Sequence, residues 1–201
     1  LKTALAHCTG TPASPYTVAL TADLVGTTAE LTVSCDAKVN LVGHKLTVRN
    51  VIITTGKSLE VTDTTATSAI AGTLIADASG VSGTAGIQTT GATLTTSGTA
   101  HVTATGGPGG AGIGGGRYGN AGTTSSNDTS TITATGGHSG AGIGGGSIGD
   151  GGTTSSNDTS TITATGGDRG AGIGGGMGGD GGGTTSNDTS TITATGGDSG
   201  A

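Results

Sequence analysis

The chain contains no tryptophan and no phenylalanine, and only two of its 201 residues are tyrosines. A compact domain of this length normally packs several large aromatic side chains into its core, so the composition argues against such a domain. Cationic residues are also few, with seven Lys and Arg against 13 Asp and Glu, and no basic patch favours binding to nucleic acid. The sequence has no run of about 18 apolar residues, so no membrane-spanning helix is predicted.

Glycine is abundant instead, with 45 residues, and much of it recurs in a repeat. The segment TSTITATGGHSGAGIGGG at residues 129–146 returns at 159–176 as TSTITATGGDRGAGIGGG. It begins again at Thr189 and is cut off at Ala201, and an earlier copy, TAHVTATGGPGGAGIGGG, occupies residues 99–116. Each copy starts 30 residues after the copy before it. A fixed period of this length indicates one structural unit that is repeated and stacked.

Each repeat has three parts. The first, TSTITAT, alternates strictly and favours a β-strand, with Ile132 on one face and Thr131, Thr133 and Thr135 on the other. The second, GAGIGGG, places one isoleucine among glycines. The third, such as GTTSSND at residues 122–128, is interpreted as a polar connector. The many glycines and the lack of a 3.6-residue apolar pattern argue against helix.

A unit this poor in apolar residues can bury a core only by stacking on its neighbours. We therefore predict an all-β fold, a right-handed parallel β-helix (β-solenoid) with Gly/Thr-rich coils of about 30 residues. Equivalent residues would then lie about 4.8 Å apart in columns. The predicted core columns are Val102, Ile132, Ile162 and Ile192, and Ile113, Ile143 and Ile173. A disordered glycine-rich linker is the alternative, but disorder gives no reason for apolar residues to keep this register.

The predicted organisation has three parts. Residues 1–38 are expected to form an N-terminal cap and the first strands, residues 39–98 irregular coils, and residues 99–201 regular repeats of which the last is truncated. The expected early strands lie near residues 17–24, 30–35, 46–48, 51–54, 59–61 and 71–78.

Both ends of the chain carry an expectation. The first residue is Leu1, with no preceding methionine or signal peptide, which indicates a trimmed form or an excerpt. After Ala201 the motif stops partway, and an uncapped parallel edge invites pairing with another chain. Two alternatives follow: further repeats continue the stack, or copies of the chain join end to end.

The two cysteines, Cys8 and Cys35, both lie near the start. In an extracellular protein they would form a disulfide that fastens the first coils, and two buried free thiols are the alternative. No cofactor is predicted. The four histidines share no repeat position, so no metal triad is indicated. They are His7, His44, His101 and His138.

Three asparagines, Asn127, Asn157 and Asn187, each lie in Asn-Asp-Thr, which is an N-glycosylation sequon in a eukaryotic secretory pathway. The alternative is an asparagine ladder, in which the side chains hydrogen bond to one another along the stack. The aspartates that follow them would stack as like charges, which solvent must screen or a cation such as calcium must bridge. Solvated turn aspartates are the expectation.

Stacking would also align the outward threonines into a flat face of hydroxyl and methyl groups. This candidate face comprises Thr131, Thr133, Thr135, Thr161, Thr163 and Thr165, and continues at residues 191, 193 and 195. It resembles the ice-binding surface of β-solenoid antifreeze proteins. The alternative is the ordinary preference of threonine for strands, and His101 interrupts the array in the first copy.

No catalytic site is predicted. Polysaccharide-cleaving β-helices need carboxylates grouped on one face, whereas the acidic residues here lie in repeated turns. The segment GAGIGGG lacks the Lys-Ser/Thr that follows the glycines of a phosphate-binding loop. We therefore expect a protein that is not an enzyme.

The irregular part and the repeats together resemble a known group of proteins. The run NLVGHKLTV at residues 40–48, followed by GKSLEVTD at 56–63, is similar to the opening of β-helical modules in large bacterial cell-surface proteins. The repeated ATGG and GAGIGGG segments resemble the same group, and the likeness covers roughly residues 20–201. The segment TTSSND departs from the group, which usually has a second short strand there, and this puts a third face of the β-helix in doubt. The resemblance implies an adhesin-like, carbohydrate-binding type of module in a secreted or wall-attached protein.

Composition, repeat and resemblance together predict an extracellular or cell-surface structural module. We expect a rigid stalk or filament segment with an adhesive or glycan-associated role, whose partners are surface glycans or further copies of itself. The bacterial resemblance favours the asparagine ladder over glycosylation. Two alternative functions stay open, a self-assembling extracellular filament and an ice-binding protein.

Overall fold

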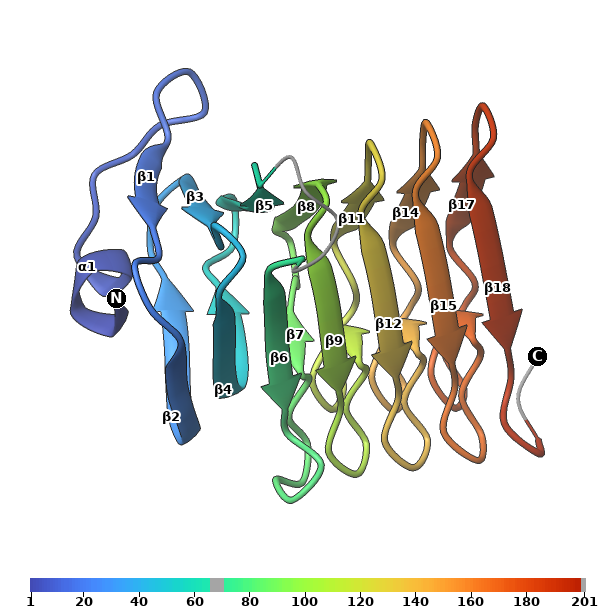
Figure 1. The fold of residues 1–201 in the computed structure, drawn as a ribbon. Coiled ribbons are helices and arrows are strands. Elements are labelled where there is room, and N and C mark those ends of the chain that lie inside the picture. The colour runs from blue at the N-terminus through green and yellow to red at the C-terminus, as the bar shows by residue number, and fades with distance from the viewer. Residues whose placement is uncertain (66–70, 200–201) are drawn as a thin grey trace.

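The structure, a computed structural model, describes residues 1–65 and 71–199. It is a stack of parallel β-strands with one short helix, α1 (Lys2–Ala6), at its N-terminal end (Figure 1). The prediction of an all-β, solenoid-like fold of parallel strands is confirmed.

One sheet has seven strands, and every neighbouring pair in it is parallel. In spatial order its strands are β1 (Tyr16–Ala19), β3 (Ala37–Asn40), β5 (Ser58–Asp63), β8 (Thr93–Gly98), β11 (Thr123–Ser126), β14 (Thr153–Ser156) and β17 (Gly183–Ser186). The spatial order follows the chain order, as expected when each coil contributes one strand and then moves on.

The second sheet has eleven strands and divides into two branches at β4 (Lys45–Ile53), which also pairs with β2 (Leu24–Val33). The threonine branch continues through β6 (Thr73–Asp77), β9 (His101–Thr105), β12 (Thr131–Thr135), β15 (Thr161–Thr165) and β18 (Thr191–Thr195). The isoleucine-glycine branch continues through β7 (Ile87–Gln88), β10 (Ile113–Gly114), β13 (Ile143–Gly144) and β16 (Ile173–Gly174).

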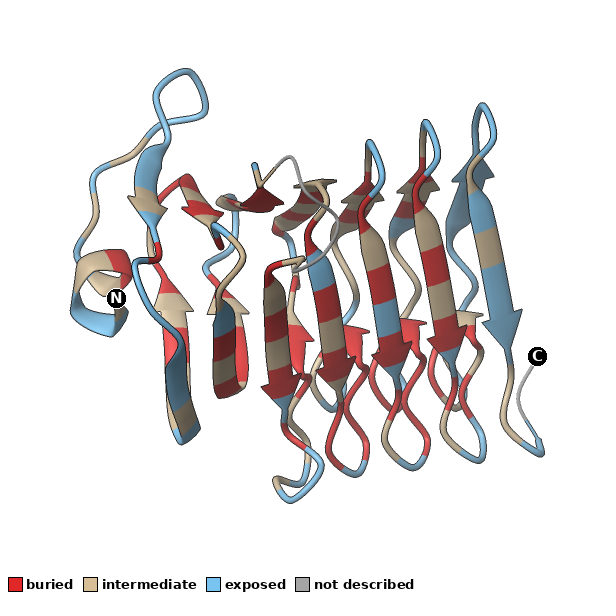
Figure 2. Cartoon of the chain, viewed as in Figure 1, coloured by how far each residue is buried: buried red, intermediate tan, exposed pale blue. Residues whose placement is uncertain are grey.

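The core lies between the two sheets and is built from aliphatic columns. In the threonine branch Val102 pairs with Ile132, Ile132 with Ile162, and Ile162 with Ile192. The first three of these side chains are buried and Ile192 is partly buried. In the isoleucine-glycine branch the column runs through Ile113, Ile143 and Ile173. Figure 2 shows the resulting alternation of buried and more exposed residues along strands such as β9, β12 and β15.

Glycine allows the backbones of neighbouring coils to approach closely in the isoleucine-glycine branch. Gly144 has a φ of 143°, and a Cβ placed on it would overlap the carbonyl oxygen of Gly174 in the next coil. Gly140 is similarly confined, because a Cβ there would overlap the carbonyl oxygen of Gly110. The GAGIGGG segment is therefore a packing requirement of the stack.

The structure corrects two sequence-based interpretations. The segment read as a polar connector contains a strand in each regular copy (β11, β14 and β17), so the third face exists. Thr124 and Ser126 point inward and pair with Leu94 and Thr96, so polar residues take over a column that is aliphatic earlier in the chain. The strands expected near residues 46–48 and 51–54 are one continuous strand, β4, because the intervening Asn50 is buried and its side chain donates to Glu30 Oε2 at 3.2 Å, so it forms no turn.

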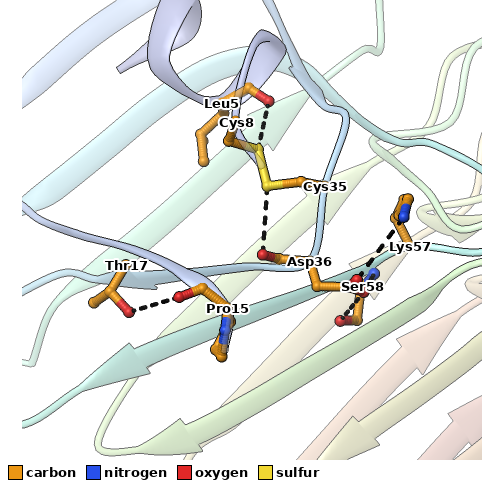
Figure 3. Close-up of a disulfide and its surroundings, with 8 residues drawn as sticks. All are labelled: Leu5, Cys8, Pro15, Thr17, Cys35, Asp36, Lys57 and Ser58. Atoms are coloured by element: carbon orange, nitrogen blue, oxygen red, sulfur yellow. Dashed lines mark hydrogen bonds and ion pairs between the residues drawn. A yellow bond between two sulfur atoms is a disulfide. The ribbon is translucent and has the colours of Figure 1, made fainter. Parts of the chain in front are cut away.

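The N-terminal end is covered and fastened. Leu5 of α1 is fully buried against the first coil, and its carbonyl accepts a hydrogen bond from the Ser34 N–H at 3.0 Å. Cys8 and Cys35 form a disulfide whose Cα atoms lie 5.7 Å apart (Figure 3). The covalent link ties the helix segment to the chain just after β2, so the first 35 residues are held to the stack.

Candidate functional site

The most regular surface of the molecule is the outer face of the threonine branch. Thr131, Thr133 and Thr135 alternate with inward residues in β12, and each pairs in register with its equivalent in β15 and then β18. The array is partly or fully exposed throughout these three strands. In β9 the same rows contain His101, Thr103 and Thr105, so the histidine occupies one corner position. Pairing with a strand on each side holds β12 and β15 parallel and in register.

The asparagines of the three Asn-Asp-Thr segments form a ladder along one edge of this face. The Asn157 side-chain NH₂ donates to Asn127 Oδ1 at 2.7 Å, and the Asn187 NH₂ donates to Asn157 Oδ1 at the same distance. The amide nitrogens of Asn157 and Asn187, which a glycan would modify, are thus hydrogen-bond donors within the stack.

The neighbouring aspartates make a second row that uses the backbone of the adjacent coil. Asp158 Oδ2 accepts a hydrogen bond from the Asp128 N–H at 3.0 Å, and Asp128 Oδ2 accepts one from the Gly98 N–H at 2.8 Å. Both aspartates have a φ of 59°, a left-handed conformation that aspartate tolerates better than most residues. Backbone donors offset part of the repulsion between these exposed carboxylates. Among the described residues no group of three or more His, Cys, Asp and Glu side chains could hold a metal ion.

A buried row of hydroxyl groups runs beside the aliphatic columns, and the sequence analysis missed it. Ser126 Oγ lies 2.9 Å from Ser130 Oγ, and Thr96 Oγ1 lies within 3.1 Å of both. Ser156 and Ser160 repeat the arrangement at 2.8 Å in the next coil. The 30-residue period could have predicted this row, because it aligns Thr124 with the core residue Leu94.

Asp63, at the end of β5, is almost completely buried and was not singled out from the sequence. Its carboxylate accepts hydrogen bonds from the N–H groups of Gly72, Thr65 and Gly43 at 2.6, 3.2 and 3.1 Å. The Thr99 hydroxyl also donates to it at 3.1 Å. Burial raises the pKa of Asp63, but the hydrogen bonds outweigh burial and hold the pKa below its ordinary value. Asp63 therefore joins three coils as a structural anion.

The histidines do not come together. His44 Nδ1 lies 3.3 Å from Asp23 Oδ1, and His138 Nδ1 lies 2.8 Å from Asp168 Oδ2. The Lys45 N–H donates to Asp23 at 2.9 Å and is the main cause of a lowered Asp23 pKa. These are exposed pairs at separate places in the stack.

Two further results bear on function. Within residues 1–65 and 71–199, no helix has the length and apolar character needed to cross a bilayer. Comparison of the chain with protein-family models, curated proteins and solved structures gives no match.

Proposed function

We propose that this chain is a rod-like structural module of an extracellular or cell-surface protein, and that the rod presents an adhesive, glycan-associated surface. In this proposal each regular coil comprises 30 residues and the coil is right-handed, because parallel β-crossovers almost always have that hand. The rod has no catalytic role.

One observation carries the proposal: each coil pairs with the next through the same, equivalent residues. Residues such as Thr133, Thr163 and Thr193 lie side by side in register, and so do the glycines of the isoleucine-glycine branch. Each coil therefore packs on its neighbour through the same interface, which supports a stiff and extendable stack. The Cys8–Cys35 disulfide supports an oxidising, extracellular location.

The rod can be tested by changing the number of coils. Three extra copies of residues 129–158 inserted after Asp158 should lengthen the particle by about 14 Å, at about 4.8 Å per coil. Small-angle X-ray scattering would measure the maximum dimension and the cross-section. An unchanged cross-section with the added length is the expected result. A rise in flexibility without a defined increase in length would overturn the proposal.

Ice binding is a second candidate, favoured specifically by the threonine array. In β12, β15 and β18 nine threonines form an in-register grid of three columns without an interrupting residue. If this face binds ice, Thr133→Tyr, at the centre of β12, should remove most of the thermal hysteresis. Thr153→Tyr, on the exposed outer side of the seven-stranded sheet, is the matched control and should leave it unchanged. Absence of thermal hysteresis in the unmodified protein would reject this candidate.

A further inference from the structure

The three complete regular copies, residues 99–128, 129–158 and 159–188, differ from one another at 11 of their 30 positions. Only four positions hold a different residue in every copy. These four variable positions are Pro108, His138 and Asp168; Gly109, Ser139 and Arg169; Arg117, Ser147 and Met177; and Tyr118, Ile148 and Gly178. All four belong to two turns, one on each side of the short isoleucine-glycine strand.

The fold brings these two turns together on one corner of the stack. The Ser147 N–H donates to the Gly109 carbonyl at 2.8 Å, and the Met177 N–H donates to the Ser139 carbonyl at 2.9 Å. Each second turn therefore lies against the first turn of the preceding copy. A hollow of about 240 Å³ lies between them, and it is called the corner groove. Its walls include Pro108, Arg117, His138, Ser139, Ser147 and Met177.

Several residues at the variable positions adopt a backbone conformation that favours glycine. Tyr118, Ser139 and Ile148 have φ values of 63°, 71° and 63°, a conformation that disfavours every residue with a Cβ and isoleucine most of all. Sister copies place glycine at two of these positions, with Gly109 at 84° and Gly178 at 79°. Side chains are thus retained where glycine fits without strain, and such strain concentrates at functional sites.

The chemistry of the corner groove is also unlike that of the rest of the repeats. Residues 121–201 contain one Lys or Arg against seven Asp, and Arg117 and Arg169 are the only Lys or Arg residues after Lys57. Arg117 lines the groove, and Arg169 Nη1 lies 3.5 Å from Sδ of the groove residue Met177. The groove residue His138 is paired with the acidic side chain of Asp168.

Arg117 lies over the ring of Tyr118, with the guanidinium carbon 5.0 Å from the ring centroid. Tyr118 is 62% exposed and does not itself line the groove, but its contact with Arg117 places an apolar ring next to the groove's cation. Ser139 and Ser147 add hydroxyl groups to the floor of the groove. A guanidinium fork, hydroxyl groups and one aromatic ring together complement a ligand that carries an anion, several hydroxyls and a CH face.

We propose that the corner groove binds an oligosaccharide that bears a carboxylate or sulfate group, with Arg117 contacting the anion and Tyr118 contacting the sugar ring. This inference rests on the glycan-associated role proposed above. The coil-insertion series tests the rod independently, so failure of binding at this groove and failure of the rod are distinguishable.

The test uses the full chain and three hexasaccharides: oligogalacturonate, a sulfated heparin-derived fragment and neutral maltohexaose. Isothermal titration at about 0.15 M salt is expected to give saturable binding of at least one acidic ligand and weaker or no binding of maltohexaose. The two acidic probes distinguish a carboxylate from a sulfate ligand. No binding of either acidic probe, or equal binding of maltohexaose, would overturn the inference.

The variant R117M/Y118G replaces the pair with Met-Gly, which the third copy already has at Met177 and Gly178, so the fold should be retained. Binding of the acidic ligand should weaken at least about tenfold, as expected for loss of a hydrogen bond to a charged group. Lys45→Gln removes the same charge from an exposed position of β4 outside the groove and should leave binding unchanged. Equal binding by R117M/Y118G and the unmodified protein, or an equal loss in Lys45→Gln, would contradict the assignment.

Discussion

At the scale of single residues, Ile148 shows how the repeat tolerates local strain. Its φ is 63°, its side chain is 56% exposed, and the equivalent residue of the next copy is Gly178. Ile148→Gly should raise the free energy of unfolding by about 0.5–1 kcal/mol, because relief of the left-handed conformation exceeds the entropy that glycine adds to the unfolded chain. Urea denaturation followed by circular dichroism would measure the change.

Ile148→Ala is the matched control, because it removes the exposed side chain but keeps the Cβ. Its effect should stay within about 0.5 kcal/mol. An equal stabilisation by both substitutions would mean that the backbone conformation is not the cause.

Asp63 makes a pH-dependent contribution to stability. Its pKa is lowered in the folded protein, so its contribution is fully present above the unfolded pKa of about 3.9 and is lost as the pH falls through the lower folded pKa. Asp63→Asn places an NH₂ group against N–H and O–H donors, which should cost about 2–3 kcal/mol at pH 7. The difference from the unmodified protein should shrink below about pH 4, as measured by denaturation over a pH series.

Asp77→Asn is the control for Asp63, because Asp77 is an exposed residue at the end of β6 whose carboxylate accepts one local hydrogen bond, from the Ser79 N–H at 3.0 Å. It should change stability by less than about 0.5 kcal/mol. A constant difference between Asp63→Asn and the unmodified protein down to pH 2.5 would contradict the assignment of a charged Asp63.

At the scale of elements, the buried hydroxyl row replaces aliphatic packing with hydrogen bonds. Ser156 Oγ and Ser160 Oγ lie 2.8 Å apart, and Ser160 Oγ also donates to the Ser126 carbonyl at 2.9 Å. Ser156→Ala and Ser160→Ala should each cost about 1–2 kcal/mol, because each removes a hydrogen bond between buried hydroxyl groups. The double variant should cost less than the sum by about 0.5–1 kcal/mol, and urea denaturation of all four proteins gives this coupling.

The outward side of the same strands supplies the comparison. Ser155 Oγ donates to Ser125 Oγ at 3.0 Å on the partly exposed face, where water can replace either partner. Ser155→Ala should therefore cost less than about 0.5 kcal/mol. Strict additivity of the two buried substitutions would show that Ser156 and Ser160 do not act as a unit.

The same elements show what the sequence could predict and why it failed elsewhere. The columns through Ile132 and Ile143 were predictable because an apolar residue among glycines and threonines marks its own position in a fixed period. Strands β11, β14 and β17 were not predicted, because TTSS and GTTS contain no apolar residue. The inward Ser126 and Ser156 of β11 and β14 instead bond to Ser130 and Ser160. The anion at Asp63 depends on hydrogen-bond donors from three coils, and no local sequence pattern predicts that these donors lie close together.

The corner groove was also missed from the sequence, although its variable positions could be counted there. The two turns of each copy are separated in sequence by the isoleucine-glycine segment, and hydrogen bonds join the second turn of one copy to the first turn of the copy before it. The internal repeat thus predicts the stack of parallel strands well and the corner groove poorly, because the stack depends on what the copies share and the groove on where they differ.

At the scale of the whole molecule, interchangeable coils make a further prediction about deletions. Removal of residues 129–158 joins Asp128 to Thr159, which recreates the Asp-Thr junction already present between Asp128 and Thr129. Every remaining coil then meets a neighbour with equivalent strands and glycines. The shortened protein should fold with the same β-sheet content per residue and lose only the stability of one interface between coils, as judged by circular dichroism and thermal unfolding.

Removal of residues 129–157, one residue fewer, is the matched control. It shifts the register after the junction by one position, and because side chains alternate with a period of two, Ile162 and Ile192 would turn toward solvent unless a bulge absorbs the shift. We expect the coils after the junction to unfold in this variant. Exposing the aliphatic column loses the free energy of its burial, and the polar rows beside it bury too little apolar surface to replace that free energy. Equal tolerance of both deletions would mean that the glycine-rich segments act as loose linkers, and equal damage would mean that the copies are not interchangeable.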